Sequence, residues 1–128
     1  MSEELNSVLQ SFSRIEKVLG AVLMNREGGV LADSLEEDKD LRNREKEIFA
    51  SLKLGEKLGK KLGLGTLNQS YLEYPRISFT AEKFRGGKSG GVNDEEKVLI
   101  VISQAGANLV RIRLEIRKVK KILEEILS

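Results

Sequence analysis

The sequence predicts an α/β fold of the α+β type, in the order helix, two strands, helix, three strands, helix. Three patterns indicate it. Residues 107–127 place apolar side chains at helical intervals of three and four. Residues 97–103 (KVLIVIS) form an apolar run typical of a strand buried on both faces, and residues 76–84 alternate like a strand with one buried face. A chain of 128 residues suits one domain, residues 1–128.

The first half of the chain predicts a helix followed by a hairpin. Residues 2–18 have an acidic start and an amphipathic stripe formed by Leu5, Val8, Phe12 and Ile15. Residues 19–25 and 30–34 are apolar segments on either side of the turn NREGG. The two glycines of that turn supply the positive φ angles that a hairpin of this length needs. We therefore expect two antiparallel strands here.

A charged connection, residues 36–44, leads into a second helix over about residues 40–62. Its expected apolar positions are Leu41, Ile48, Leu52, Leu58 and Leu62.

Glycines interrupt this helix at four-residue intervals. Gly55, Gly59 and Gly63 share one face, continued by Ser51. Each interior glycine costs about 0.5–1 kcal/mol relative to alanine. Two interpretations stay open: another backbone approaches this face closely, or the glycines end the helix early. On either interpretation Gly63 is the expected C-cap.

Three strands and the last helix follow. Residues 66–74 predict a strand that stops at Pro75, which suits a sheet edge or a junction between strands. In residues 76–84, Ile77, Phe79 and Ala81 form the apolar face, and the opposite face carries Arg76, Ser78, Thr80 and Glu82. The expected core stripe of the last helix comprises Leu109, Ile112, Ile116, Val119, Leu123 and Ile126.

The segment RGGKSGG, residues 85–91, contains the residue types of a phosphate-binding loop. A Walker A loop would require glycine where Glu82 stands, and a helix after the loop. Here Asp94, Glu95 and Glu96 lead into a strand instead, and their charge repels phosphate. We therefore expect residues 85–96 to be a mobile hairpin loop, with Lys88 as a contact for a partner.

Composition excludes most catalytic chemistry. The chain has no Cys and no His, so it has no cysteine nucleophile, histidine base or usual zinc site. Ser103 has no base to activate it. We expect no catalytic residue, no cofactor and no metal site, and hence no enzyme.

Charge and hydropathy indicate a soluble, cytoplasmic protein. The net charge of +2 is too small for a strong nucleic-acid site. No apolar run approaches the length of a membrane span, so no membrane insertion is expected. The many Lys and Glu residues are typical of thermophile surfaces.

Two segments resemble the roadblock/dynein light-chain family. Residues 22–34 resemble its early hairpin of strand, acidic-glycine turn and strand. Residues 100–113 resemble its late strand, which runs through a small-residue turn into a helix that starts Arg-x-Arg, here Arg111 and Arg113. The terminal helices make the chain more similar to the prokaryotic branch that partners Ras-like GTPases. The insert at residues 85–96 is longer than the family's usual hairpin.

The resemblance implies a profilin-like sandwich and a homodimer. The five-stranded antiparallel sheet would carry the second helix on one face and the terminal helices on the other. Family members pair through the second helix and the third strand, so that small residues on that helix admit a close approach. The dimer interface implied here comprises Ser51, Leu52, Gly55, Gly59, Leu62, Leu67, Gln69, Tyr71 and Glu73.

The function implied by the resemblance is the regulation or scaffolding of a small Ras-like GTPase. The expected partner contacts are Arg42, Arg44, Arg85 and Lys88. One of these arginines is also a candidate arginine finger. Activation, nucleotide exchange and tethering all stay open. The alternative is an adaptor dimer that holds a larger complex together without a GTPase.

Overall fold

The computed structural model describes residues 2–35, 45–85 and 95–127. The expected connection at residues 36–44, including Arg42 and Arg44, lies outside this part, and so do residues 86–94 with Lys88. The elements are α1 (Ser2–Leu9), a 3₁₀ helix η1 (Gln10–Arg14), β1 (Val18–Asn25), β2 (Val30–Asp33), α3 (Glu45–Leu62), β3 (Gln69–Glu73), β4 (Ile77–Arg85), β5 (Glu96–Gln104) and α4 (Leu109–Ile126).

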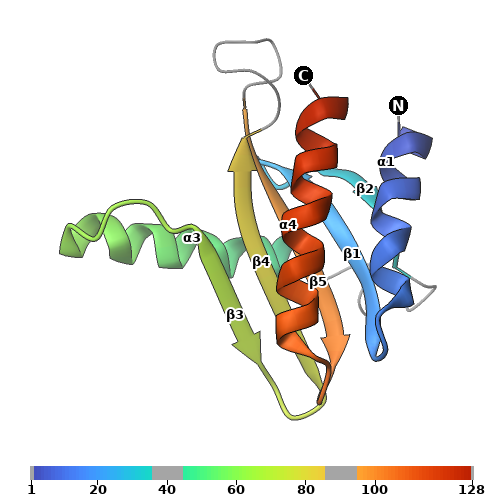
Figure 1. The fold of residues 1–128 in the computed structure, drawn as a ribbon. Coiled ribbons are helices and arrows are strands. Elements are labelled where there is room, and N and C mark those ends of the chain that lie inside the picture. Colours follow the sequence, from blue (N-terminus) through green and yellow to red (C-terminus); the bar gives the residue numbers. More distant parts are fainter. Residues whose placement is uncertain (1, 36–44, 86–94, 128) are drawn as a thin grey trace.

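The strands form one five-stranded antiparallel sheet in the order β2-β1-β5-β4-β3. Helices α1 and α4 cover one face side by side, and α3 crosses the other face (Figure 1). This confirms the predicted fold class and the placement of the helices. It also confirms that the segment ending before Pro75 is an edge strand, because β4 is the one strand beside β3 in the described parts of the chain.

Two apolar cores lie on the two faces of the sheet. Under α1 and α4, Leu9, Phe12, Ile116 and Leu123 pack on residues of β1 and β5. Under α3, the smaller core contains Ile48 and Leu52 packed on the sheet. Alternate residues of β5 serve the two cores, so the central strand is buried on both faces as predicted.

Strand β4 differs from the expectation of one buried face. Ser78 and Thr80 on its polar face are each only 5% exposed, because α4 covers them. Glu82 on the same face accepts a hydrogen bond from Lys120 Nζ of α4 at 2.5 Å. The alternating pattern predicted the two faces correctly, but it could not show that a helix would bury the polar one.

The first helix is shorter than the predicted residues 2–18. It ends at Leu9, continues as η1, and the chain then turns through Ile15 and Lys17 into β1. Serines at 7, 11 and 13 favour the helix only weakly. The tighter turn still buries Phe12 and Ile15, so the expected apolar stripe enters the core by a different path.

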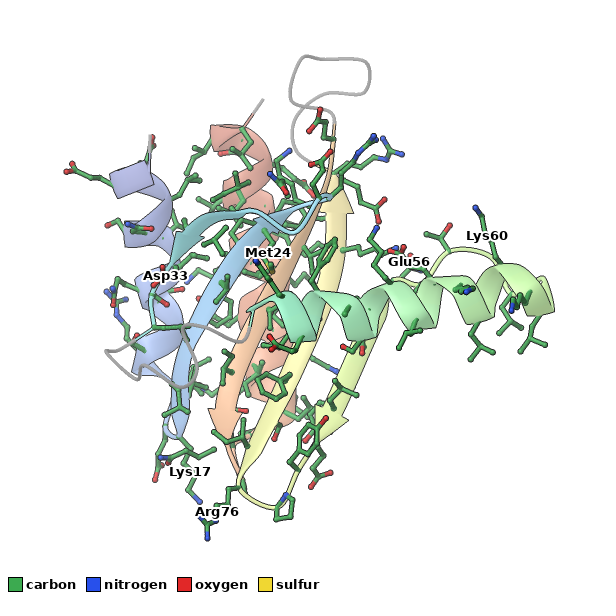
Figure 2. The ribbon with its side chains drawn as sticks, turned by 180° about the vertical axis from the view of Figure 1, so that it is seen from behind. Lys17, Met24, Asp33, Glu56, Lys60 and Arg76 are labelled. Atoms are coloured by element: carbon green, nitrogen blue, oxygen red, sulfur yellow. The ribbon has the colours of Figure 1, made fainter. Side chains whose placement is uncertain are left out.

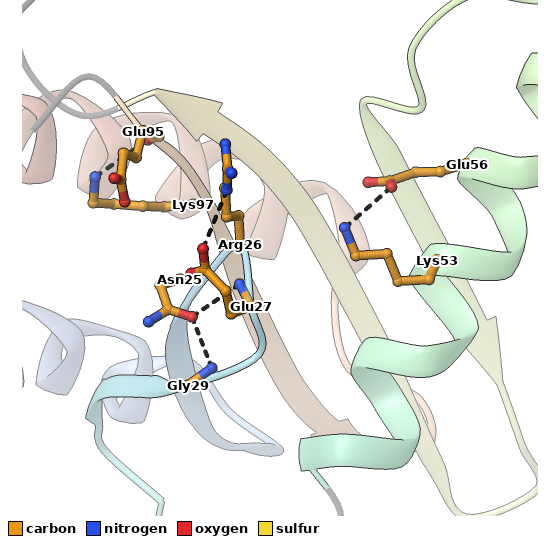
Figure 3. A network of polar contacts seen from close by, with 8 residues as sticks. All are labelled: Asn25, Arg26, Glu27, Gly29, Lys53, Glu56, Glu95 and Lys97. Carbon is orange, nitrogen blue, oxygen red and sulfur yellow. Dashed lines mark hydrogen bonds and ion pairs between the residues drawn. The ribbon is translucent and has the colours of Figure 1, made fainter.

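The β1–β2 hairpin forms where the turn signal predicts it. The Asn25 side-chain oxygen accepts hydrogen bonds from the backbone N–H groups of Glu27 at 3.0 Å and Gly29 at 2.8 Å (Figure 3). Gly28 adopts the positive φ of 89° that the turn requires.

The C-terminus of α3 confirms Gly63 as the cap. Gly63 has a φ of 67°, its N–H donates to the Lys60 carbonyl, and the Leu64 N–H donates to the Gly59 carbonyl. This pair of bonds is the Schellman arrangement. It turns the chain back along α3 toward β3.

Two glycine substitutions separate a steric clash from backbone strain alone. A Cβ at Gly20 would lie 2.7 Å from the Ser34 carbonyl oxygen at a φ of 149°, whereas a Cβ at Gly65, with a φ of 87°, would meet no atom within 4 Å. We expect Gly65→Ala to lower the free energy of unfolding by about 1–3 kcal/mol, the cost of the strained backbone alone. Gly20→Ala should lower it by more, because the steric clash adds to the strain. Urea denaturation measures both, and equal losses would contradict the steric argument.

Candidate protein-interaction surface

The outer edge of β3 presents backbone groups that pair with no strand among residues 2–35, 45–85 and 95–127. The Lys83 N–H donates to the Asn68 carbonyl, and the Tyr74 N–H donates to the Ile77 carbonyl. Bonding directions alternate along an antiparallel strand. Ser70 and Leu72 therefore bond to β4, opposite Ala81 and Phe79. It follows that the N–H and C=O groups of Gln69, Tyr71 and Glu73 point away from the sheet. Such an edge is a template for another strand.

The side chains of these same residues lie on the α4 side of the sheet. Gln69, Tyr71 and Glu73 stand opposite Glu82, Thr80 and Ser78 of β4. All three are exposed, because α4 covers β4 and β5 but does not reach β3. Tyr74 packs edge-on against Phe79 on the opposite face. The aromatic residues of this strand are thus surface residues rather than core residues.

Helix α3 extends past this edge. Figures 1 and 2 both show its C-terminal half running beyond β3. Three leucines at four-residue intervals lie along it: Leu54, Leu58 and Leu62 are 68%, 56% and 62% exposed. We call this row the leucine flank. Leu58 and Leu62, two of the apolar positions predicted for this helix, are exposed, because the described strands do not extend beneath this part of α3.

The glycine face of α3 contacts the chain's own return segment, residues 63–68. A Cβ at Gly55 would lie 2.9 Å from Leu67 Cδ2, and a Cβ at Gly59 would lie 2.9 Å from the Gly65 carbonyl oxygen. A backbone does approach this face closely, as one of the two interpretations required. That backbone belongs to the same chain, so the glycines have a structural reason without a second protomer.

The predicted interface residues therefore fall into three groups. Leu52 is buried in the core beneath α3, and Ser51 donates its hydroxyl to the Ile48 carbonyl at 2.7 Å. Gly55, Gly59 and Leu67 form the internal contact just described. Leu62, Gln69, Tyr71 and Glu73 lie on the accessible surface. Leu54 is a surface residue that is absent from the predicted set, although its four-residue spacing from Leu58 is a signal for it in the sequence.

An ion-pair network fixes α3 to the sheet near the same edge. The Lys83 side chain of β4, only 8% exposed, pairs with Glu56 of α3 and, at 2.9 Å, with Glu96 of β5. Lys53 joins Glu56 at 3.4 Å (Figure 3). These contacts hold the start of the projecting half of α3.

The network shifts the pKa values of both central groups. Burial tends to raise the pKa of Glu56, but Lys83 and then Lys53 outweigh it and hold that pKa below the ordinary 4.5. Burial tends to lower the pKa of Lys83, but the hydrogen bonds and charges of Glu56 and Glu96 leave it above the ordinary 10.5. The stabilisation is therefore fully present between about pH 4.5 and 10.5.

Among the predicted partner contacts, the described structure contains only Arg85. It is exposed at the end of β4, opposite Glu96. Ser103 is buried in β5. The described residues contain no group of three or more acidic side chains arranged to hold a metal ion. None of the described helices is both long enough and apolar enough to cross a membrane.

Glycine substitutions on α3 test the internal contact. In Gly55→Ala the new Cβ meets only the flexible end of the Leu67 side chain. The variant should therefore keep most of the stabilisation of about 0.5–1 kcal/mol that alanine gives a helix relative to glycine. Gly59→Ala meets a backbone carbonyl and should unfold at a lower temperature than Gly55→Ala. Calorimetry at several protein concentrations makes the comparison. A difference that appears only at high concentration would assign the glycines to contacts between protomers.

The ion-pair network predicts a pH dependence. Because the folded-state pKa of Glu56 is lowered, its contribution is present above pH 4.5 and is lost as pH falls through the folded-state value. We expect Glu56→Gln to lower the free energy of unfolding by about 1–3 kcal/mol at pH 7, and by much less in acid. Urea denaturation at neutral and acidic pH measures this. A loss independent of pH would contradict the electrostatic origin.

No protein-family model matches the sequence, and no curated protein matches it either. Solved structures do match the fold. The Roadblock/LC7 domain from Streptomyces avermitilis has a TM-score of 0.76 at 16% identity, over 95% of this chain and 96% of that chain. An MglB structure with a tetrameric arrangement has a TM-score of 0.78 at 18% identity, over 98% and 89%. Myxococcus xanthus MglB has a TM-score of 0.73 at 20% identity, over 96% and 94%.

At such identities the likeness concerns the fold. The matches span nearly the full length of each chain and agree with the resemblance seen in residues 22–34 and 100–113. The chain has the fold of the Roadblock/LC7 domain, the fold shared by MglB.

Proposed function

We propose that this chain is a non-catalytic homodimer that binds a small Ras-like GTPase and regulates or scaffolds it. The observation that carries the proposal is the unpaired edge of β3 beside the leucine flank. Both surfaces belong to elements that the roadblock family uses for pairing. The fold shared with MglB supports a place among GTPase-associated regulators, and the tetrameric MglB structure shows that a protein of this fold self-associates.

The β3 edge is suited to pairing with a second copy of itself. A two-fold axis at Tyr71 places Gln69 opposite Glu73 of the second copy. Each outward-pointing residue then exchanges both of its backbone hydrogen bonds across the axis. Such a contact is isologous, so the same residues serve both copies and the assembly closes as a dimer. The two sheets become one continuous sheet.

The leucine flank adds apolar burial to this pairing. Helix α3 extends past β3 (Figures 1 and 2). In the proposed pairing its C-terminal half would therefore reach over the sheet of the second copy. Full burial of a leucine side chain contributes about 1.5–3 kcal/mol. The flank would therefore supply most of the free energy of association, while the strand fixes the register. This assignment moves the helix contact from Gly55 and Gly59 to the row of leucines.

A regulator of this kind supplies shape rather than a reactive group. A partner that binds one conformation of a switch loop more tightly than another shifts the population of the GTPase. Activation, exchange and tethering each follow from a different preferred conformation. No part of this scheme requires a histidine or a phosphate-binding loop in the chain.

A charge in the leucine flank should break the dimer. We expect Leu58→Asp with Leu62→Asp to sediment as a monomer at concentrations where the wild type is a dimer. Val110→Asp is the matched control, since Val110 is equally exposed on α4, in the other helix layer. Sedimentation equilibrium measures the mass. A dimeric double variant, or a monomeric wild type, would overturn the proposed interface.

The GTPase assignment is tested with candidate Ras-like GTPases from the same source. Each is loaded with GDP or with a GTP analogue and passed over the immobilised full chain. We expect retention that depends on the nucleotide, because discrimination between switch conformations is the proposed mechanism. A dimer that retains none of them in either state would favour the structural adaptor.

A further inference from the structure

A groove of about 660 Å³ lies between α3 and the return segment, on the side of α3 away from the leucine flank. Its volume is within the range of ligand sites in proteins. Figure 2 shows Glu56 and Lys60 together on one side of the projecting half of α3. The lining residues are Lys53, Glu56, Lys57, Gly59, Lys60, Gly63, Gly65, Thr66, Leu67, Lys83 and Glu96.

The groove carries an excess of positive charge that no other side chain in the described part of the chain neutralises. Four lysines and two glutamates line it, a surplus of two positive charges. Both glutamates already pair with Lys83. Lys57 and Lys60 make no ion pair with any residue in the described part of the chain. Two lysines that face a groove without a counter-charge indicate an anionic occupant.

The opposite wall offers backbone groups to the same occupant. The N–H groups of Gly65, Thr66 and Leu67 donate no hydrogen bond to another residue of the described structure. These residues have neither helical nor strand structure, although they precede β3 directly. Unpaired backbone groups beside a strand are what an extended peptide bonds to when it docks along a chain.

We propose that this groove binds an acidic, extended segment of a partner protein. Its carboxylates would pair with Lys57 and Lys60, and its backbone would lie along residues 65–67. A peptide fits better than a nucleic acid, since none of the described residues that line the groove is an aromatic residue that could stack on a base. The site does not depend on the identity of the partner as a GTPase. In the proposed dimer the groove would stay open, because none of the leucines of the flank lines it.

The test uses a fluorescein-labelled oligoglutamate peptide and the full chain, with binding measured by fluorescence anisotropy. We expect saturable binding that weakens as salt rises. Lys57→Glu with Lys60→Glu should weaken it about tenfold or more, because two attractive contacts become repulsive. Lys46→Glu with Lys61→Glu is the matched control, with the same charge change on exposed positions of α3 outside the groove. That control should bind like the wild type.

Amide chemical shifts of the wild type give a second readout that needs no variant. Peptide titration should move the amide signals of Gly65, Thr66 and Leu67 and leave those of β2 in place. The proposal would be overturned if the peptide did not bind, or if both double variants weakened peptide binding equally. It would also be overturned if the amide signals of residues 65–67 did not move. So would an oligonucleotide or inorganic tripolyphosphate that binds the groove more tightly than the peptide.

Discussion

The fold depends on burial of one antiparallel sheet on both faces, with β5 at its centre. Alternate residues of β5 enter the two cores, so α1 and α4 must lie on one face and α3 on the other. The helices cover the middle of the sheet, where apolar side chains are densest. Among the strands that the structure describes, β3 has β4 as its one neighbour. The edge that the proposed dimer uses is therefore a consequence of where the core lies.

The same constraint explains why α3 projects from the molecule. Only its first half, with Ile48 and Leu52, rests on the sheet. Beyond the edge, it is supported by its own return segment through Gly55 and Gly59 and by the pairing of Glu56 with Lys83. These supports lie on two sides of the helix and leave the leucine flank uncovered. An extended, rigid helix with a leucine row is well suited to reach over a second subunit.

The sequence predicted the features that local patterns determine. The run KVLIVIS identified the central strand, NREGG identified the hairpin, and Gly63 identified the end of α3. It failed where distant segments decide. Ser78 and Thr80 are buried because α4 lies over them, and Leu58 is exposed because the sheet ends beneath α3. Glu56, Lys83 and Glu96 come from three elements, and nothing in their local sequence brings them together.

Hydrogen exchange at the β3 edge tests the central claim most directly. The N–H groups of Ser70 and Leu72 bond to β4, whereas those of Tyr71 and Glu73 point outward and are protected only if a second strand pairs with them. Exchange of these four amides, measured by NMR over a range of protein concentrations, separates the two sets. The account predicts that Tyr71 and Glu73 become as protected as Leu72 when the concentration rises. Exchange of Tyr71 and Glu73 at the unprotected rate at every concentration would contradict it.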